Sequence, residues 1–358
     1  MAGQFRFGFS GDEMGEADVD AGESHAGSGT GQMSSLEQAQ SVPAQAHNVA
    51  EWLSSFPSRI SYSTIKIESP KGRCLDVPRR ELFDVKMQLL AEDEGNDADL
   101  LAGLDSADIK TNVYEGGFKS WECSIDLAAL LLDRGPRKDI DDLCRVDHVV
   151  ELGCGTAIPT LILYQYALSE GLSLYFTLAD YNVAVLRLVT LPNLLLMWAK
   201  SLKSSTASPF SSENPNPLHE SPTGDLEITP QICASFLESL REQNLILNLV
   251  SGSWTPPTAF LPLIPVSQDM NTLVLASETI YSPSSLSAFT EVLVGILERV
   301  RMGKAMVAAK RVYFGVGGSV SAFKQEAAGR KAVAYEIENA DIIGRNGVQR
   351  CLMEVQMM

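Results

Sequence analysis

Cysteine and histidine are scarce in this chain of 358 residues, which has six cysteines and four histidines. No two cysteines form the Cys-x-x-Cys spacing that structural zinc sites and redox sites use, so we expect no metal site. Near the N-terminus no apolar run follows a basic start, so no secretory signal is expected. The longest apolar stretch, Val183 to Ala199, is interrupted by Arg187, Pro192 and Asn193, which predicts that it does not span a bilayer. These absences favour a reducing compartment, cytoplasmic and nuclear, without membrane contact.

Basic residues are also in short supply, with 28 Lys and Arg against 45 Asp and Glu and a formal net charge of −17. Two segments lack Lys and Arg altogether: Phe7 to Ser58 holds eight acids and Ala91 to Asp108 holds seven. Direct binding to nucleic acid needs clustered Lys and Arg, and is not expected. The acidic segments suit a basic protein partner, although solvated tails without a partner are an equally good interpretation.

Composition divides the chain into three parts. Residues 1–57 hold few large apolar side chains and are predicted to be a disordered acidic segment, with a short aromatic motif at Phe5 to Phe9. Residues 58–110 are predicted to form a lead-in strand and helix followed by an acidic loop. Residues 111–358 form the main domain, in which the Ser-, Pro- and Asn-rich stretch 201–230 predicts a disordered insertion.

From Asp147 onward, short apolar runs alternate with helical patterns, which predicts an α/β domain with a parallel sheet and helices on both faces. The expected strands are Val149 to Leu152, Leu174 to Ala179, Leu245 to Val250, Leu273 to Ser277, Met306 to Phe314, Val333 to Ile337 and Val348 to Val355. The expected helices between them are Pro159 to Ser169, Ala184 to Lys200, Pro230 to Glu242 and Ser285 to Val300. The sheet is therefore predicted to have seven strands and to end in an antiparallel pair.

A glycine loop follows the first of these strands, in the sequence Val149 to Ala157 with Gly153 and Gly155. Such a loop lets a ligand approach the backbone at the carboxyl end of a buried strand. The third glycine of a dinucleotide-binding loop would fall at Ile158, and no Gly-Lys-Ser/Thr follows to cradle phosphates. A ligand without a pyrophosphate is therefore favoured.

Candidate ligand contacts follow the next two strands. Asp180 ends a strand, where a carboxylate can accept hydrogen bonds from both hydroxyls of a ribose. Tyr181 and Asn182 could frame the same nucleoside, although Asn182 is also a good helix cap. Further along, Gly252 and Ser253 precede Trp254, whose indole could stack on a purine or simply cover the sheet edge.

An acid and a tyrosine three residues apart, Glu278 and Tyr281, follow the strand that ends at Ser277. They could orient a nucleophile and pack against a positively charged methyl donor. The alternative is that they cap the helix that starts near Ser284.

Four motifs in this order resemble the histidine protein methyltransferase family, within the class I S-adenosyl-L-methionine-dependent methyltransferases. They are Val113 to Cys123, Glu151 to Pro159, Asp180 to Asn182 with Val185 to Asn193, and Ser277 to Tyr281. The resemblance covers Ile60 to the end except 200–230, and Phe5 to Phe9 resembles the amino-terminal motif of that family. It implies a Rossmann-like seven-stranded sheet with a final antiparallel strand.

The resemblance also implies the cofactor, S-adenosyl-L-methionine, and the residues that bind it. These are Lys119, Ser120, Trp121, Glu122, Cys123, Glu151, Gly153, Gly155, Asp180, Tyr181, Asn182, Gly252, Ser253, Trp254, Ser277, Glu278 and Thr279. Ser253 departs from the family, which often has an acid there. The implied catalytic residues are Glu278 and Tyr281.

The implied reaction is methylation of the ring nitrogen farther from the backbone, on a histidine of universal protein three of the large ribosomal subunit. We expect a monomer that binds this basic protein and influences ribosome biogenesis or translation. Glu278 is the candidate acceptor for the proton that the imidazole loses, with Glu122 and Asp126 as alternatives. Two other functions stay open: lysine methylation by the same fold, and an inactive cofactor-binding scaffold in ribosome assembly.

Overall fold

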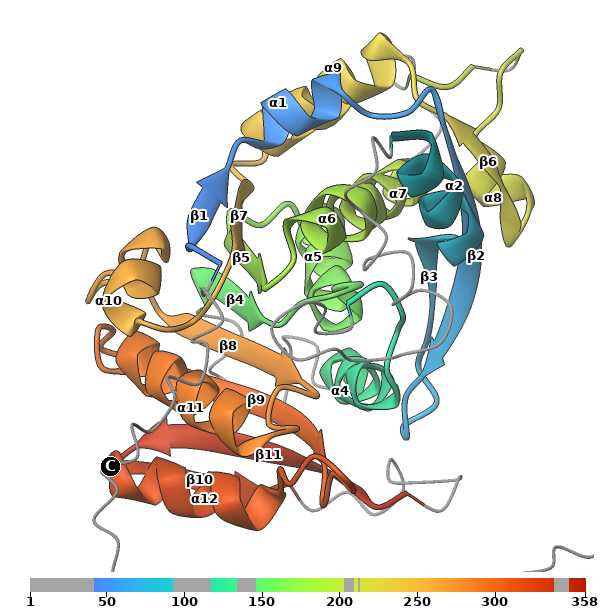
Figure 1. The fold of residues 1–358 in the computed structure, drawn as a ribbon. Helices are drawn as coiled ribbons and strands as arrows, with labels where there is room; N and C mark the ends of the chain where they lie inside the picture. Colours follow the sequence, from blue (N-terminus) through green and yellow to red (C-terminus); the bar gives the residue numbers. More distant parts are fainter. Residues whose placement is uncertain (1–41, 93–116, 134–145, 203–208, 212, 338–347) are drawn as a thin grey trace, which may run out of the picture. The chain divides into compact units, whose positions relative to one another are not determined.

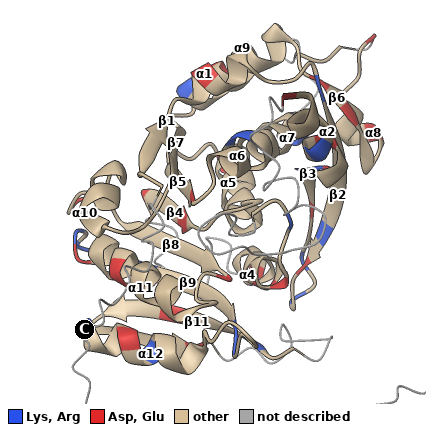
Figure 2. Cartoon of the chain, in the orientation of Figure 1, with Lys and Arg blue, Asp and Glu red and all other residues tan. Residues whose placement is uncertain are grey.

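A computed structural model describes residues 42–92, 117–133, 146–202, 209–211, 213–337 and 348–358. The chain divides into two units, Met1–Ala39 and Gln40–Met358, and every described residue belongs to the second. The predicted aromatic motif at Phe5 to Phe9 and most of the acidic stretch 91–108 lie outside the described residues. Lys and Arg are interspersed with Asp and Glu over the described elements (Figure 2).

The central sheet has eight strands in the order β1-β7-β5-β4-β8-β9-β11-β10 (Figure 1). Its strands are β1 Gln45–His47, β4 His148–Leu152, β5 Tyr175–Asp180, β7 Ile246–Ser251, β8 Thr272–Ser277, β9 Gly303–Lys310, β10 Ala332–Glu336 and β11 Arg350–Met357. The five strands β7, β5, β4, β8 and β9 run parallel to one another. Strand β11 lies between β9 and β10 and is antiparallel to both. The predicted fold class is confirmed: seven strands form a doubly wound sheet whose last strand is antiparallel, and β1 is an addition at one edge.

Alternation along the buried strands explains why helices cover both faces. Val149 packs in one hydrophobic cluster together with Leu161, while its neighbour Val150 packs in another with Phe289 and Phe323. Successive side chains of a strand point to opposite faces, so an apolar run buries both. One face is covered by α4 Glu122–Asp133, α5 Ile158–Glu170 and α7 Leu191–Ser201, and the other by α11 Pro283–Leu297 and α12 Val320–Gly329. The short helices α10 Pro257–Phe260 and η3 Leu261–Leu263 pack beside α11.

The predicted helix after Asp180 is longer and more varied than its sequence indicated. It consists of α6 Val183–Val185, a π-helical turn η2 Leu186–Thr190, and α7. Its 19 residues are long and apolar enough to cross a membrane by length and composition alone, but 78% of its most apolar window is buried inside the protein. It therefore packs as a core helix.

A second, three-stranded sheet in the order β3-β2-β6 packs beside this helix. It contains β2 Arg59–Glu68, β3 Cys74–Arg80 and β6 Thr223–Glu227, and α2 Leu82–Glu92 follows β3. The lead-in strand and helix were predicted; β3 was not. The insertion predicted to be disordered contributes α8 Pro217–Glu220 and β6 instead, because backbone pairing with β2 supplies the stabilisation that its few apolar side chains do not.

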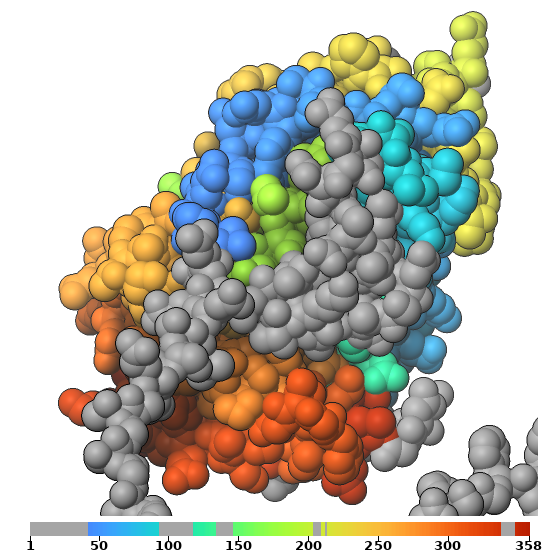
Figure 3. Space-filling model, in the orientation of Figure 1, coloured from blue at the N-terminus to red at the C-terminus, as the bar shows by residue number. Residues whose placement is uncertain are grey.

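The end of the predicted disordered N-terminal segment is also ordered. Here β1 pairs antiparallel with β7, and α1 Val49–Ser54 packs beside α9 Pro230–Glu242. His47 Nε2 lies 2.7 Å from Ser251 Oγ, and its ring stacks on Trp52 at 4.4 Å between centroids. On the face shown in Figure 3, the blue residues of this segment lie against the yellow residues of α9. Pairing with an edge strand orders a segment that composition alone marks as disordered.

Candidate active site

A cavity of about 340 Å³ lies at the carboxyl ends of the parallel strands, where doubly wound sheets bind their ligands. It is lined by Gly117, Lys119, Trp121, Ser124, Gly153, Cys154, Gly155, Thr156, Asp180, Tyr181, Gly252, Ser253, Trp254, Thr255, Ser277, Glu278, Thr279, Tyr281, Ser282, Ser284, Ser285, Ala288, Lys310, Tyr313 and Val316. The four predicted motif regions therefore meet at one site. Val113 to Gly116, the start of the first motif, lie outside the described residues.

The glycine loop between β4 and α5 has left-handed backbone at both glycines, with φ of 65° at Gly153 and 49° at Gly155. A Cβ added at Gly153 would lie 2.9 Å from Thr279 Cγ2, and one at Gly155 would lie 3.1 Å from the carbonyl oxygen of Gly117. Both conformation and space therefore require glycine. The bare backbone leaves room for a ligand beside the loop.

Asp180 ends β5 and is 6% exposed. Its Oδ2 accepts a hydrogen bond from Gly155 N at 3.0 Å, and its Oδ1 accepts one from Asn182 N at 3.1 Å. The carboxylate thus ties the glycine loop to the next strand and also lines the cavity, where carboxylate oxygens can accept hydrogen bonds from hydroxyl groups.

The loop after β7 forms another wall. Gly252 has φ of 106°, and Ser253 N donates to Val42 O at 2.8 Å, so the N-terminal segment holds this loop. Trp254 lines the cavity and packs against Phe289 with ring centroids 5.7 Å apart. The predicted purine-stacking role of Trp254 is compatible with this position.

Glu278 follows β8 with φ of 58°, an uncommon conformation for a residue with a side chain. Its carboxylate Oε1 lies 3.5 Å from Lys310 Nζ, and its side chain is 9% exposed. Residues held in such conformations cluster at functional sites, so this backbone supports a functional rather than a merely capping role. Helix α11 is capped independently, by Ser282 with Ser285.

Several cavity residues were not predicted from the sequence, and two of them, Lys310 and Tyr313, bear on the chemistry of the site. Lys310 ends β9, and its Nζ lies 5.1 Å from the ring centroid of Trp121 and 5.8 Å from that of Tyr313. Burial and the nearby Glu278 carboxylate raise the pKa of Tyr313 well above its usual value. Neither residue belongs to a motif, and no spacing signal in the sequence marked them.

Five predicted cofactor residues do not line the cavity: Ser120, Glu122, Cys123, Glu151 and Asn182. Glu151 is fully buried beneath the loop, where its carboxylate accepts a hydrogen bond from Thr160 N at 3.0 Å and burial raises its pKa to about 8. Ser120 Oγ bonds Thr156 Oγ1 at 3.1 Å, and Cys123 is buried in the core. These side chains support the walls from behind.

Asn182 and Glu122, which also do not line the cavity, have different surroundings. Asn182 occupies the position before α6 without a side-chain capping bond, and its buried Nδ2 has no hydrogen-bond partner among the described residues. Glu122 is exposed and lies 3.6 Å from Arg350. Arg350 also holds the third acid considered, Asp126, at 2.6 Å. Glu278 is therefore the candidate proton acceptor that lines the cavity.

The cavity fits S-adenosyl-L-methionine on three observations. A glycine cradle has no room for a Cβ, the Asp180 carboxylate faces the cavity, and the buried Thr279 Oγ1 has no hydrogen-bond partner among the described residues. In the part of the chain that the structure describes, no group of three or more His, Cys, Asp and Glu side chains could hold a metal ion.

Comparison with known proteins identifies the family. No family model matches the chain. Histidine protein methyltransferase 1 of Saccharomyces cerevisiae is 40% identical over 260 residues, 69% of this chain and 67% of that protein. Histidine protein methyltransferase 1 of Schizosaccharomyces pombe is 36% identical over 296 residues, 82% of this chain and 79% of that protein.

Solved structures are more distant. The rRNA methyltransferase AviRa of Streptomyces viridochromogenes is 15% identical, with a TM-score of 0.38. The match covers 70% of this chain and 92% of the AviRa chain. The fold assignment rests on the strand order rather than on this likeness. The sequence relatives confirm the predicted class of enzyme, a methyltransferase that uses S-adenosyl-L-methionine. The chain belongs to the histidine protein methyltransferase 1 family.

Proposed function

We propose that this chain methylates a ring nitrogen of a histidine in universal protein three of the large ribosomal subunit, and so influences ribosome biogenesis or translation in the cytoplasm and nucleus. Two relatives named for protein-histidine methylation support the reaction class. The observation that carries the proposal is the cavity at the carboxyl ends of β4, β5, β7 and β8, with the glycine cradle and Asp180 lining it together with Glu278.

The reaction asks little of a base before the methyl group moves. A neutral imidazole, with an unperturbed pKa of about 6.5, already carries a lone pair near pH 7. When bound, S-adenosyl-L-methionine supplies an electrophilic methyl group on a positively charged sulfur. A ring nitrogen held in line with that methyl group could accept it, and the positive charge would then pass to the imidazole.

Glu278 has the chemistry that the second half of the reaction needs. The methylated ring becomes a cation and must lose the proton on its other nitrogen. A carboxylate at the cavity wall stabilises that charge and accepts the proton. Trp121 and Tyr281 line the same cavity and can fix the plane of the ring by packing.

The first experiment incubates the purified protein with methyl-labelled S-adenosyl-L-methionine and universal protein three from cells lacking the enzyme. Amino-acid analysis of the product separates the two ring-methylated histidines from methylated lysine. Label in methylhistidine supports the proposal, and its isomer identifies the nitrogen. Label on lysine overturns the assignment of the acceptor, and cofactor binding without label would favour a scaffold.

A second experiment tests the role of Glu278. Glu278→Gln keeps the size of the side chain but cannot accept the proton, so kcat should fall by about a hundredfold or more. Calorimetric affinity for S-adenosyl-L-methionine is measured on the same variant, because Glu278 is also a predicted cofactor residue and a loss of binding must be told apart from a loss of catalysis. Glu122→Gln and Asp126→Asn test the two alternative acids; a comparable fall in kcat in either one, with Glu278→Gln active, would move the role there.

A further inference from the structure

One side of the cavity is an environment typical of sites that bind cations. The ring centroids of Trp121 and Tyr313 lie 5.1 Å and 5.8 Å from one ammonium group, and the Glu278 carboxylate lies 3.5 Å from it. An acid with aromatic rings around it binds ammonium groups by charge and by cation–π attraction. Here the ammonium group is that of the chain's own Lys310.

The side chain of Lys310 is held on several sides. It comes from the end of β9, is 20% exposed, and lines the cavity together with Trp121, Tyr313 and Glu278. Its backbone N donates to Tyr313 Oη at 3.3 Å, which holds the phenol ring beside it. The cation is thus part of the cavity wall.

Lys119 and Asp180 also line the cavity, and the Lys310 ammonium is the cation that lies 3.5 Å from the Glu278 carboxylate. Burial raises the pKa of the Cys123 thiol, with the Glu278 carboxylate as a further cause, so the thiol is neutral. Asp126 is bonded to Arg350 through Nε at 2.6 Å and Nη2 at 3.2 Å, and neither residue lines the cavity. Lys310 and Glu278 therefore form a charge pair in the cavity wall.

We propose that Lys310 is a specificity-determining residue, which fills the cation position beside Glu278 and so excludes protonated acceptors from the site. This inference rests on the proposed function and deepens it. A lysine ammonium would have to approach an ammonium already in place, in a partly desolvated cavity where charge repulsion is strong. A neutral imidazole meets no such repulsion when it binds, and the Glu278 carboxylate beside it can offset the charge that the ring gains on methylation.

The test compares two altered forms of universal protein three, in which the methylated histidine is replaced by Gln or by Lys. Both are assayed as inhibitors of methylation of the unaltered protein. The parent enzyme should bind the neutral Gln form at least about tenfold more tightly than the cationic Lys form. In Lys310→Met this preference should vanish or reverse, because the Glu278 carboxylate then attracts the cation.

Two variants separate charge from structure. Lys310→Arg keeps a cation and should keep the preference. Lys304→Met makes the same change on the same strand, where Lys304 pairs with Glu354 at 3.7 Å and does not line the cavity, and should also keep it. An unchanged preference in Lys310→Met overturns the proposal. Absence of any methylation of the histidine protein by the parent enzyme is a failure of the proposed function instead.

A second measurement needs no acceptor. Lysines of the full chain are reductively methylated with ¹³C-formaldehyde, and the Lys310 signal is identified by its loss in Lys310→Arg. Ring currents of Trp121 and Tyr313 should shift that signal upfield from the position of exposed lysines, and Trp121→Leu should return it part of the way. A Lys310 signal at the ordinary position in the parent protein would overturn the occupied cation position.

Discussion

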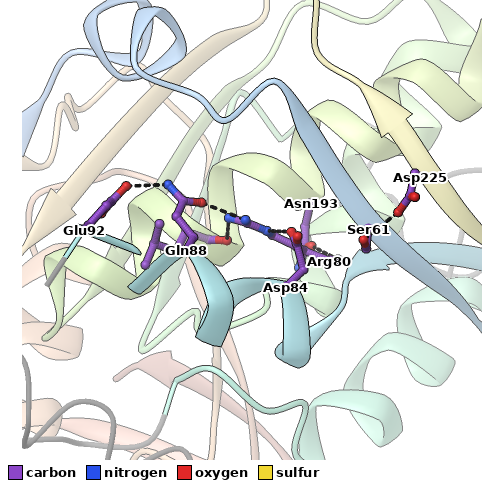
Figure 4. A network of polar contacts seen from close by, with 8 residues as sticks. Ser61, Arg80, Asp84, Gln88, Glu92, Asn193 and Asp225 are labelled. Atoms are coloured by element: carbon purple, nitrogen blue, oxygen red, sulfur yellow. Dashed lines mark hydrogen bonds and ion pairs between the residues drawn. The ribbon is translucent and has the colours of Figure 1, made fainter. Parts of the chain in front are cut away.

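The side-chain amide of Asn193 donates a hydrogen bond to the carbonyl oxygen of Thr156, at 2.9 Å. Its Oδ1 accepts a bond from Arg80 N at 2.7 Å (Figure 4). One fully buried amide therefore joins the glycine loop to the end of β3. Arg80 is itself fixed by Asp84 at 2.6 Å and by the carbonyl oxygen of Leu188 at 2.9 Å. The segment Val185 to Asn193, which is part of the family resemblance, therefore supports the cofactor loop from outside the cavity through its last residue.

Replacing Asn193 should weaken both the fold and the cofactor site. In Asn193→Asp a carboxylate oxygen faces the Thr156 carbonyl oxygen, and two buried acceptors without a shared proton cost about 1–3 kcal/mol. The free energy of unfolding in urea should fall by that amount. Calorimetric affinity for S-adenosyl-L-methionine should fall severalfold, because the glycine loop loses a support.

Asn216→Asp is the matched control. Asn216 is buried and makes an equivalent pair of bonds, donating to Ala199 O at 2.7 Å and accepting from Leu218 N at 3.1 Å, away from the loop. It should lose stability with unchanged cofactor affinity. Equal affinity losses in the two variants would show that the Asn193 effect is only general destabilisation.

The parallel core strands could be predicted because burial on both faces makes their sequences continuously apolar. The short strands were missed for the opposite reason. In β6 only Leu226 is buried, and β1 exposes two of its three residues. Such strands are stabilised by backbone hydrogen bonds to a partner that is distant in sequence, and composition does not record that partner.

The candidate site could be predicted where a motif directly follows the end of a strand, because parallel strands bring their carboxyl ends together. Motif membership did not indicate which way a side chain points. Glu151 stands two residues from Val149 on β4 and shares its face, beneath the helices rather than in the cavity. Lys310 was missed because it reaches the cavity from β9, through tertiary packing alone.

A second prediction separates crowding from backbone strain in the glycine loop. Gly153→Ala places a Cβ 2.9 Å from Thr279 Cγ2 at φ of 65°. We expect a loss of stability of about 1 kcal/mol from the conformation and at least about a tenfold loss of cofactor affinity from the displaced cavity wall. Isothermal calorimetry and urea unfolding measure the two effects.

Gly171→Ala controls for the conformational part. Gly171 ends α5 at φ of 66°, and a Cβ there would meet no atom within 4 Å. Its variant should show the same small loss of stability and full cofactor affinity. Unchanged affinity in Gly153→Ala would place the cofactor elsewhere.

A third prediction concerns the contact of Gly252 with the N-terminal segment. A Cβ at Gly252 would clash with the carbonyl oxygen of Pro43, which belongs to the backbone and cannot turn aside. Gly252→Ala should therefore push residues 42–44 away and break the bond from Ser253 N to Val42 O. Amide hydrogen exchange at Ser253 should accelerate, and cofactor affinity should fall with it.

Gly72→Ala provides the comparison, since Gly72 has φ of 77° and open space around its Cβ position. Exchange at Ser253 should stay slow in that variant. Unchanged exchange at Ser253 in Gly252→Ala would contradict the inferred role of the N-terminal segment in holding this loop.

The last prediction concerns the dependence of stability on pH through Glu151. Burial raises the pKa of this carboxyl in the folded protein to about 8, from an ordinary value of 4.5. Between these two values the folded state holds a proton that the unfolded state has lost, so stability must fall as pH rises through this window. By itself this group removes up to roughly 5 kcal/mol between pH 4.5 and 8.

Glu151→Gln removes this titration and keeps a carbonyl oxygen that can accept from Thr160 N. The variant's free energy of unfolding in urea, minus that of the parent, should increase steadily from pH 5 to pH 8. Glu298→Gln, which removes an exposed glutamate at the end of α11, is the matched control. A flat difference for Glu151→Gln would mean that the carboxylate is ionised in the folded protein, and a hydrogen-bond donor for the second oxygen would then have to exist beneath the glycine loop.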